Sequence, residues 1–407
     1  MMKLAAIVPS IAVLAACTTL TEPAEPAPSP SLHETMIVFD SHLDTPINFS
    51  RPDFSLIADN PSVLGRTQVD LPKMQRGGLD GGFWVIYTPQ GPLDEESMQS
   101  ARDAALFRAS EIREAAAAYE DFELVYTADA AEAAVRDGKR AMLVSMENAY
   151  PLGNDISMLT TFHNFGLRMV GPVHFRSNQF ADSATDIEAP HDGLSPLGEE
   201  LIKEANRLGM ILDGSHAADS TVRDMMALSK TPIILSHSGP KAIFDHPRNI
   251  DDDLMRELAA SGGVIQINAL GSYLEELEPT PERAAALEAL FADFDAPPAE
   301  LPPEQQAEFR TRFLALNEAF PPPLSSFDKY MEHVLHALEV VGPDHIGIGA
   351  DWDGGGGVEG MEDVSALPRV TEALMAAGYT AEDLQKIWAG NMMRLLRQAE
   401  AAKEIAD

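Results

Sequence analysis

The sequence has a single cysteine and few basic residues. Because only one of its 407 residues is cysteine, an internal disulfide is excluded. The 29 lysines and arginines face 64 aspartates and glutamates, and the net charge of -35 would repel nucleic-acid phosphates and anionic lipid surfaces. We therefore expect no nucleic-acid partner and interpret the charge as a solvated acidic surface. No G-x-S-x-G motif occurs, which argues against a serine hydrolase with a nucleophile elbow.

The apolar run at the N-terminus, residues 4–14, is too short to span a bilayer. It follows a lysine and ends in two alanines directly before Cys17, so residues 1–16 are typical of an export signal. The string L-A-A-C resembles a bacterial lipoprotein signal, in which Cys17 is lipidated and becomes the mature N-terminus. Thr18 follows the cysteine, which in that resemblance favours a lipid anchor in the outer membrane, facing the periplasm. The alternative is an ordinary signal peptide cut near a chance cysteine.

The rest of the chain divides into a tether and one large domain. Residues 17–33 are rich in proline and lack apolar periodicity, so we expect an extended linker there and a folded domain over residues 34–407. Within the domain, short apolar runs alternate with helical patterns, which is typical of a parallel sheet. The expected strands are residues 36–40, 81–87, 141–146, 168–173, 210–214, 232–236, 262–268 and 345–350. Eight such strands predict a closed α/β fold, the (β/α)8 TIM barrel.

Helical patterns lie between the expected strands. The clearest begins with Ser195 as N-cap and Pro196 at the first helical position, and it ends at Gly209. Others are expected near residues 99–119, 219–229, 251–261, 326–341 and 380–400. Residues 271–325, between the seventh and eighth strands, add two amphipathic helical patterns with phenylalanine stripes. Because a loop that follows a barrel strand lies on the catalytic face, we interpret this helical insertion as a lid or a wall of the site.

Polar side chains stand where most of the expected strands end. His42 and Asp44 follow the first strand, and since side chains alternate along a strand they point the same way. The ends of the later strands carry Glu147, His174, His216, His237 and Asp351. Any one of these has an alternative explanation as a buried or solvent-facing polar residue. Together, at one mouth of a barrel, they offer enough nitrogen and oxygen ligands for two divalent ions, with zinc as the leading candidate.

The motifs resemble those of the membrane dipeptidase family, also called renal dipeptidases, within the metal-dependent hydrolase barrels. The resemblance covers most of residues 36–398 and includes D-S-H-L-D-T-P at 40–46, G-L-S-P-L-G at 193–198, S-H-S at 236–238 and G-I-G-A-D-W-D-G at 347–354. It implies a TIM barrel that holds two zinc ions per subunit and hydrolyses dipeptides, including those with a C-terminal D-residue, by a metal-bridging hydroxide. Dimerisation is a further family expectation.

The same resemblance assigns a role to each site residue. The implied metal ligands are His42, Asp44, Glu147, His216 and His237, with Glu147 shared by both ions. His174 would bind the substrate and polarise the scissile carbonyl, and Arg248 would hold the substrate carboxylate. Asp351 would bind the substrate and act as the acid/base.

The chain departs from the family pattern beside the ligands, at Ser41 and Leu43, and after the seventh strand, where Leu270 stands in place of an aromatic residue. Two alternatives to a dipeptidase remain open. One is another small-amide hydrolase on the same barrel, acting on an acylated amino acid or a β-lactam. The other is a non-catalytic zinc-binding or solute-binding lipoprotein.

Overall fold

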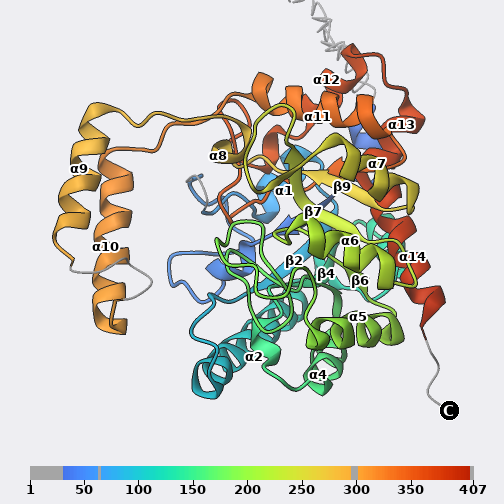
Figure 1. The fold of residues 1–407 in the computed structure, drawn as a ribbon. Helices are drawn as coiled ribbons and strands as arrows, with labels where there is room; N and C mark the ends of the chain where they lie inside the picture. Colours follow the sequence, from blue (N-terminus) through green and yellow to red (C-terminus); the bar gives the residue numbers. More distant parts are fainter. Residues whose placement is uncertain (1–30, 63–65, 295–300, 404–407) are drawn as a thin grey trace, which may run out of the picture.

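The computed structural model describes residues 31–62, 66–294 and 301–403 (Figure 1). Cys17, the expected signal and most of the expected linker lie outside these residues. Leu32 already packs against the core, and it is followed by His33, which the sequence places in the linker. Its side chain is buried, with Nδ1 2.6 Å from Oγ1 of Thr371 and Nε2 2.8 Å from the carbonyl oxygen of Gly77. Because both ring nitrogens are bonded inside the protein, the linker ends before His33 rather than after it.

The strands build the parallel barrel that the sequence predicts (Figure 1). Within the described residues, eight of them form its wall: β1 (Phe39–Leu43), β2 (Gly81–Tyr87), β4 (Arg140–Glu147), β5 (Leu167–Val170), β6 (Ile211–Leu212), β7 (Ile234–Pro240), β9 (Val264–Ile267) and β10 (Ile346–Ile348). Two short strands lie beside this wall, β3 (Phe122–Leu124) against β4 and β8 (Asn249–Ile250) against β7. The pairing order is β1-β2-β4-β5-β6 in one sheet and β10-β9-β7-β8 in the other.

Two isolated parallel bridges join these sheets into a closed ring. Asp213 pairs with Ile234, which links the end of β6 to β7, and Leu43 pairs with Trp352, which links β1 to the segment after β10. The second bridge explains a difference from the expected first strand at 36–40. The strand runs instead from Phe39 to Leu43, because Leu43 is paired on both sides, with Trp84 and with Trp352. His42 is therefore held within the sheet and not in a loop after it.

The interior of the barrel is packed below the site. Buried apolar residues of the strands, most of them in the first half of their strand, form one cluster that includes Phe39, Phe83, Leu143, Met169, Ile211, Ile234 and Val264. Residues of α14 (Asn391–Ala402) belong to the same cluster. The barrel is thus filled with side chains at its lower end, and the polar residues at the upper strand ends stand on a rigid floor.

Helices cover the outside of the barrel (Figure 1). They are α1 (Leu71–Gly77), α2 (Glu95–Ala118), α3 (Ala128–Arg136), α4 (Ser157–Phe165), α5 (Pro196–Leu208), α6 (Asp219–Leu228), α7 (Asp252–Ala260), α11 (Phe327–Val341), α12 (Pro368–Ala376), α13 (Ala381–Gln385) and α14. The expected cap of α5 is confirmed, since Oγ of Ser195 accepts from the backbone N–H of Gly198 at 3.0 Å. The helix expected over 380–400 is divided by a π-helical turn, Lys386–Gly390. In the part of the chain that the structure describes, none of the helices combines the length and apolarity needed to cross a bilayer.

The insertion after β9 contains α8 (Gly271–Leu274), α9 (Pro281–Ala292) and α10 (Pro303–Ala319). Helices α9 and α10 form a hairpin that stands out from the body of the barrel (Figure 1). Their phenylalanine stripes pack on each other, with the ring centroid of Phe309 5.3 Å from that of Phe291 and 5.4 Å from that of Phe294. The stripes therefore hold the two helices of the hairpin together and do not point into the barrel.

Candidate metal centre

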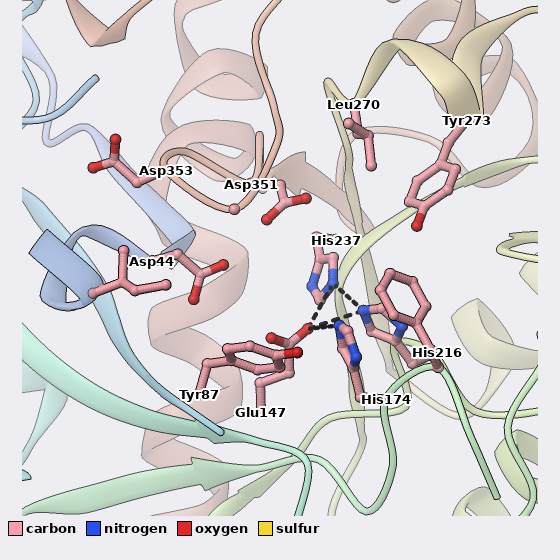
Figure 2. A pocket seen from close by; sticks show the side chains of 13 residues that line it. Asp44, Tyr87, Glu147, His174, His216, His237, Leu270, Tyr273, Asp351 and Asp353 are labelled. Atoms are coloured by element: carbon pink, nitrogen blue, oxygen red, sulfur yellow. Dashed lines mark hydrogen bonds and ion pairs between the residues drawn. The ribbon is translucent and has the colours of Figure 1, made fainter. Parts of the chain in front are cut away.

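The strand ends bring the predicted site residues together (Figure 2). Glu147 ends β4, and His42 is the last residue but one of β1. His237 lies in the middle of β7, just before its last pair with β9, while His216 and Asp351 follow β6 and β10. His216 and Asp351 have φ angles of 68° and 66°, in the left-handed region that residues with a Cβ rarely adopt. Such strained backbone persists where the surrounding structure over-determines it, as it does around a functional site.

The two carboxylate oxygens of Glu147 face different histidines. Oε1 lies 2.9 Å from Nε2 of His216 and 3.3 Å from Nε2 of His237 (Figure 2). Oε2 lies 3.8 Å from Nε2 of His42. One carboxylate thus stands between His216 and His237 on one side and His42 on the other, an arrangement that a bridging ligand would need.

Asp44 and Asp351 complete the group around His42. Nε2 of His42 lies 3.5 Å from Oδ2 of Asp44 and 4.0 Å from Oδ1 of Asp351. The structure therefore places Asp351 beside the predicted ligands His42 and Asp44, whereas the sequence assigned it acid/base and substrate-binding roles.

The residues present fit a divalent cation. Nε2 of His42 is buried and has no hydrogen-bond partner among the described residues, although it faces three carboxylates. Burial alone lowers the pKa of His42, but the charges of Glu147 and Asp44 outweigh it and raise the pKa to about 10. Burial raises the pKa of Glu147, and it raises that of Asp351 to about 7. So much buried negative charge calls for a positive partner, and imidazole nitrogens with carboxylate oxygens are the ligands of zinc.

His174 stands at the edge of this centre as a neutral imidazole. Its Nε2 lies 3.7 Å from Oε1 of Glu147, and its ring packs against Tyr87 and Phe175 with centroids 4.9 Å and 3.9 Å away. Burial lowers the pKa of His174 to about 3, and the positive charge of Arg248 adds to the effect. A neutral ring can donate one hydrogen bond to an oxygen that becomes negative during a reaction.

Arg248 is buried behind the pocket wall. Its side chain is only 2% exposed, and Nη2 donates to the carbonyl oxygen of His237 at 3.0 Å. The guanidinium lies over the ring of Tyr273, and Nε has no hydrogen-bond partner among the described residues. The structure thus places this cation next to the centre with part of its donor capacity unused.

A pocket of about 170 Å³ opens onto the centre. It is lined by Asp44, Ile47, Tyr87, Glu147, His174, Phe175, His216, His237, Leu270, Tyr273, Asp351, Asp353 and Gly354. Its size suits a small substrate. Among these residues, the sequence did not predict Ile47, Tyr87, Phe175 or Tyr273. Of the four, Tyr87 carries a usable signal because it ends an expected strand. Within the described part of the insertion, α8 supplies the pocket wall through Tyr273, so the expected wall is a property of α8 and not of the hairpin.

A parallel barrel with histidines and carboxylates gathered at its strand ends defines the class of metal-dependent hydrolases. Comparison with known proteins narrows this class. Residues 28–407 match the family described as "Membrane dipeptidase (Peptidase family M19)", and the chain belongs to this family of metallopeptidases.

Individual relatives agree with this assignment. The chain is 32% identical to Dipeptidase tcpJ of Claviceps purpurea (strain 20.1) over 338 residues, 82% of this chain and 69% of that protein. It spans 65% of the length of mouse (Mus musculus) Dipeptidase 3, to which it is 28% identical over 90% of its own length.

Solved structures agree with it as well. The probable dipeptidase PvdM from Pseudomonas aeruginosa superimposes with a TM-score of 0.79 and 31% identity, covering 91% of this chain and 97% of that one. A metallopeptidase from Rhodobacter sphaeroides, liganded with a phosphinate mimic of the dipeptide L-Ala-D-Ala, gives a TM-score of 0.70 and 25% identity over 89% of this chain and 99% of that one.

Proposed function

We propose that the protein is a zinc-dependent dipeptidase whose substrates include dipeptides with a C-terminal D-residue. The observation that carries the proposal is the position of Glu147, whose two carboxylate oxygens face separate groups of ligands. The D-residue is supported by the related R. sphaeroides metallopeptidase, which is liganded with a mimic of L-Ala-D-Ala. The small pocket supports a short substrate.

Two zinc ions would be held by His42 and Asp44 on one side and by His216 and His237 on the other, with Glu147 between them. Bound there, zinc lowers the pKa of water toward neutrality and so supplies the nucleophile at pH 7.

The chain's own groups orient the substrate and move the protons. His174, kept neutral by burial, would donate a hydrogen bond to the scissile carbonyl oxygen as its charge grows. Asp351, with its pKa raised by burial to about 7, would take a proton from the attacking water at neutral pH and pass it to the leaving amine. The charge of Arg248 would attract the C-terminal carboxylate, while Ile47, Phe175 and Leu270 would contact apolar side chains.

The protein would work from a membrane surface. Cys17, following a short apolar run, would carry the lipid, and the anchor would lie in the outer membrane facing the periplasm. The proline-rich residues that follow would separate the barrel from the bilayer. Homodimerisation is proposed from the family resemblance alone.

In the decisive experiment, the zinc-loaded protein is given a panel of compounds, and the hydrolysis of each is measured. The panel contains L,L- and L,D-dipeptides, N-acyl amino acids and a β-lactam. We expect dipeptides to be cleaved, activity to be lost on chelation, and zinc to restore it. A preference for N-acyl amino acids or the β-lactam would establish the other small-amide hydrolase. Zinc binding without turnover of any of these compounds would favour a binding protein.

A further inference from the structure

A hydroxyl and a carboxylate with no role in the proposed reaction lie directly behind two of the predicted metal ligands. Asp213 follows β6 and Ser236 lies in β7, and the side chains of both are buried. Oγ of Ser236 lies 2.5 Å from Oδ2 of Asp213, 2.8 Å from Nδ1 of His237 and 3.4 Å from Nδ1 of His42. One hydroxyl therefore touches a histidine from each side of Glu147.

The other partners of Asp213 determine which way these hydrogen bonds run. Oδ1 of Asp213 accepts from the backbone N–H groups of Ser215 and Ser236, each at 2.9 Å. A carboxylate oxygen accepts hydrogen bonds, and the hydroxyl of Ser236 donates its single hydrogen to Oδ2. Oγ then has only lone pairs left for the two histidines. Nδ1 of each ring must carry a hydrogen, so Nε2 is the nitrogen that remains for a metal.

Nε2 is the atom that each ring turns toward the centre. Nε2 of His237 lies 3.3 Å from Oε1 of Glu147, and Nε2 of His42 lies 3.8 Å from Oε2. The hydrogen-bond direction imposed by Asp213 therefore leaves free the nitrogen that a metal would need.

We propose that Asp213 and Ser236 are positioning residues that fix the Nδ1–H tautomer of His237 and His42 and thereby raise the affinity of both halves of the centre for zinc. The inference rests on the proposed function, since it requires that the centre binds zinc. It also assigns Asp213 a place outside the ligand set, although it lies close to both histidines, because both its oxygens already accept hydrogen bonds.

The junction between β6 and β7 explains why Asp213 and Ser236 lie side by side. The bridge between Asp213 and Ile234 aligns the end of β6 with β7, which places Asp213 beside Ser236 two residues further along β7. The hydrogen bond between Asp213 and Ser236 thus orients the two histidines that contact Ser236.

The test has two arms. Ser236→Ala removes the acceptor for both rings, whereas Asp213→Asn presents an amide that donates to Oγ and forces the hydroxyl to donate to Nδ1. Zinc affinity would be measured by chelator competition against the metal-free protein. We expect affinity to fall by about 10-fold to 100-fold, as is typical when the partner of a metal-binding histidine is removed. Zinc affinity should fall more in the half of the centre that contains His237, because His237 lies closer to Oγ of Ser236 than His42 does. Ser236→Thr, which keeps a hydroxyl, should restore most of the affinity.

The tautomer itself would be read from 15N shifts of labelled histidines in the metal-free protein. His237 should be protonated at Nδ1 in the wild type and shift toward Nε2–H in Asp213→Asn. Matched controls are Ser325→Ala, which removes a buried hydroxyl that donates to Glu275 at 2.6 Å, and Asp182→Asn, which changes a buried carboxylate that accepts backbone amides. Neither control should change zinc affinity.

The outcomes separate the two proposals. A wild-type protein that binds no zinc would overturn the proposed function and this inference with it. A wild type that binds zinc, with Ser236→Ala and Asp213→Asn binding equally well, would overturn the inference alone. An unchanged tautomer of His237 in folded Asp213→Asn would do the same.

Discussion

The guanidinium of Arg248 lies over the ring of Tyr273, with its central carbon 5.4 Å from the ring centroid. A cation stacked in this way is held in one orientation, and the aromatic ring is held as a wall of the pocket. This contact joins the part of the site proposed to bind the substrate carboxylate to α8, the first helix of the insertion.

Arg248→Lys tests the proposed recognition of the carboxylate. Lysine keeps the charge but loses the planar fork, so KM for a free dipeptide should rise by about 10-fold to 100-fold while kcat changes little. The measurement compares each dipeptide with its C-terminal amide, which lacks the carboxylate. If the variant lost equal efficiency on both, Arg248 would act only by supporting Tyr273.

Asp351→Asn separates proton transfer from metal binding. Asparagine keeps the size of the side chain but cannot take a proton, so kcat should fall by about 10²-fold to 10⁴-fold with KM little changed. Zinc content must be measured on the same preparation, because Oδ1 of Asp351 lies 4.0 Å from Nε2 of His42. Loss of a stoichiometric zinc would make Asp351 a ligand, and activity equal to the parent would remove it from the mechanism.

Tyr273→Ala and removal of the α9–α10 hairpin distinguish two parts of the insertion. Since Tyr273 lines the pocket and the hairpin packs through its own phenylalanines, only Tyr273→Ala should broaden the range of accepted side chains. The ratio of kcat/KM for dipeptides with large and small side chains is the measurement. The hairpin would be replaced by a short Gly-Ser linker. If this deletion changed the ratio, the lid interpretation would hold for the whole insertion.

His333 should make the protein less stable in acid. Its buried ring contacts the carbonyl oxygen of Leu274 through Nε2 at 2.9 Å, and burial lowers its pKa from 6.5 to about 4. As pH falls below 6.5, His333 binds a proton in the unfolded chain but stays neutral in the folded chain. Its contribution to the free energy of unfolding is therefore complete above pH 6.5 and is lost progressively down to about pH 4. The loss is on the order of 3 kcal/mol.

His333→Gln keeps a neutral donor at this position, so the free energy of unfolding should depend less on pH between pH 7 and pH 4. Urea unfolding over this pH range is the measurement. The control is His336→Gln on the same helix, whose ring faces the carboxylate of Asp252 at 2.8 Å. Equal slopes for the wild type and His333→Gln would contradict the assignment.

Cys17→Ser tests the lipid anchor. The thiol has no part in the proposed chemistry, so the variant should keep full turnover per folded molecule and move from the membrane fraction to the soluble fraction. Membrane association that survives the substitution would contradict the lipoprotein prediction.

The sequence by itself determined the barrel and the residues gathered at its mouth. Parallel strands show as short apolar runs, and the residue that ends such a run lies at the same edge of the barrel as its counterparts, so the pattern of runs is enough to place Glu147 and His237 together. Helices such as α3 and α4 were missed because their signals are weak: the buried residues of α3 are all alanines, and no side chain caps the N-terminus of α4.

Only the tertiary structure decided how these residues face one another. The separate directions of the two Glu147 oxygens, the left-handed backbone of His216 and the burial of Arg248 depend on strands far apart in the chain. The contact between Asp213 and Ser236 exists because the pairing of β6 with β7 aligns residues 23 positions apart. Spacing along the chain predicts which side chains reach one end of a barrel, but the closure of the sheet sets the distances and hydrogen-bond directions on which metal binding depends.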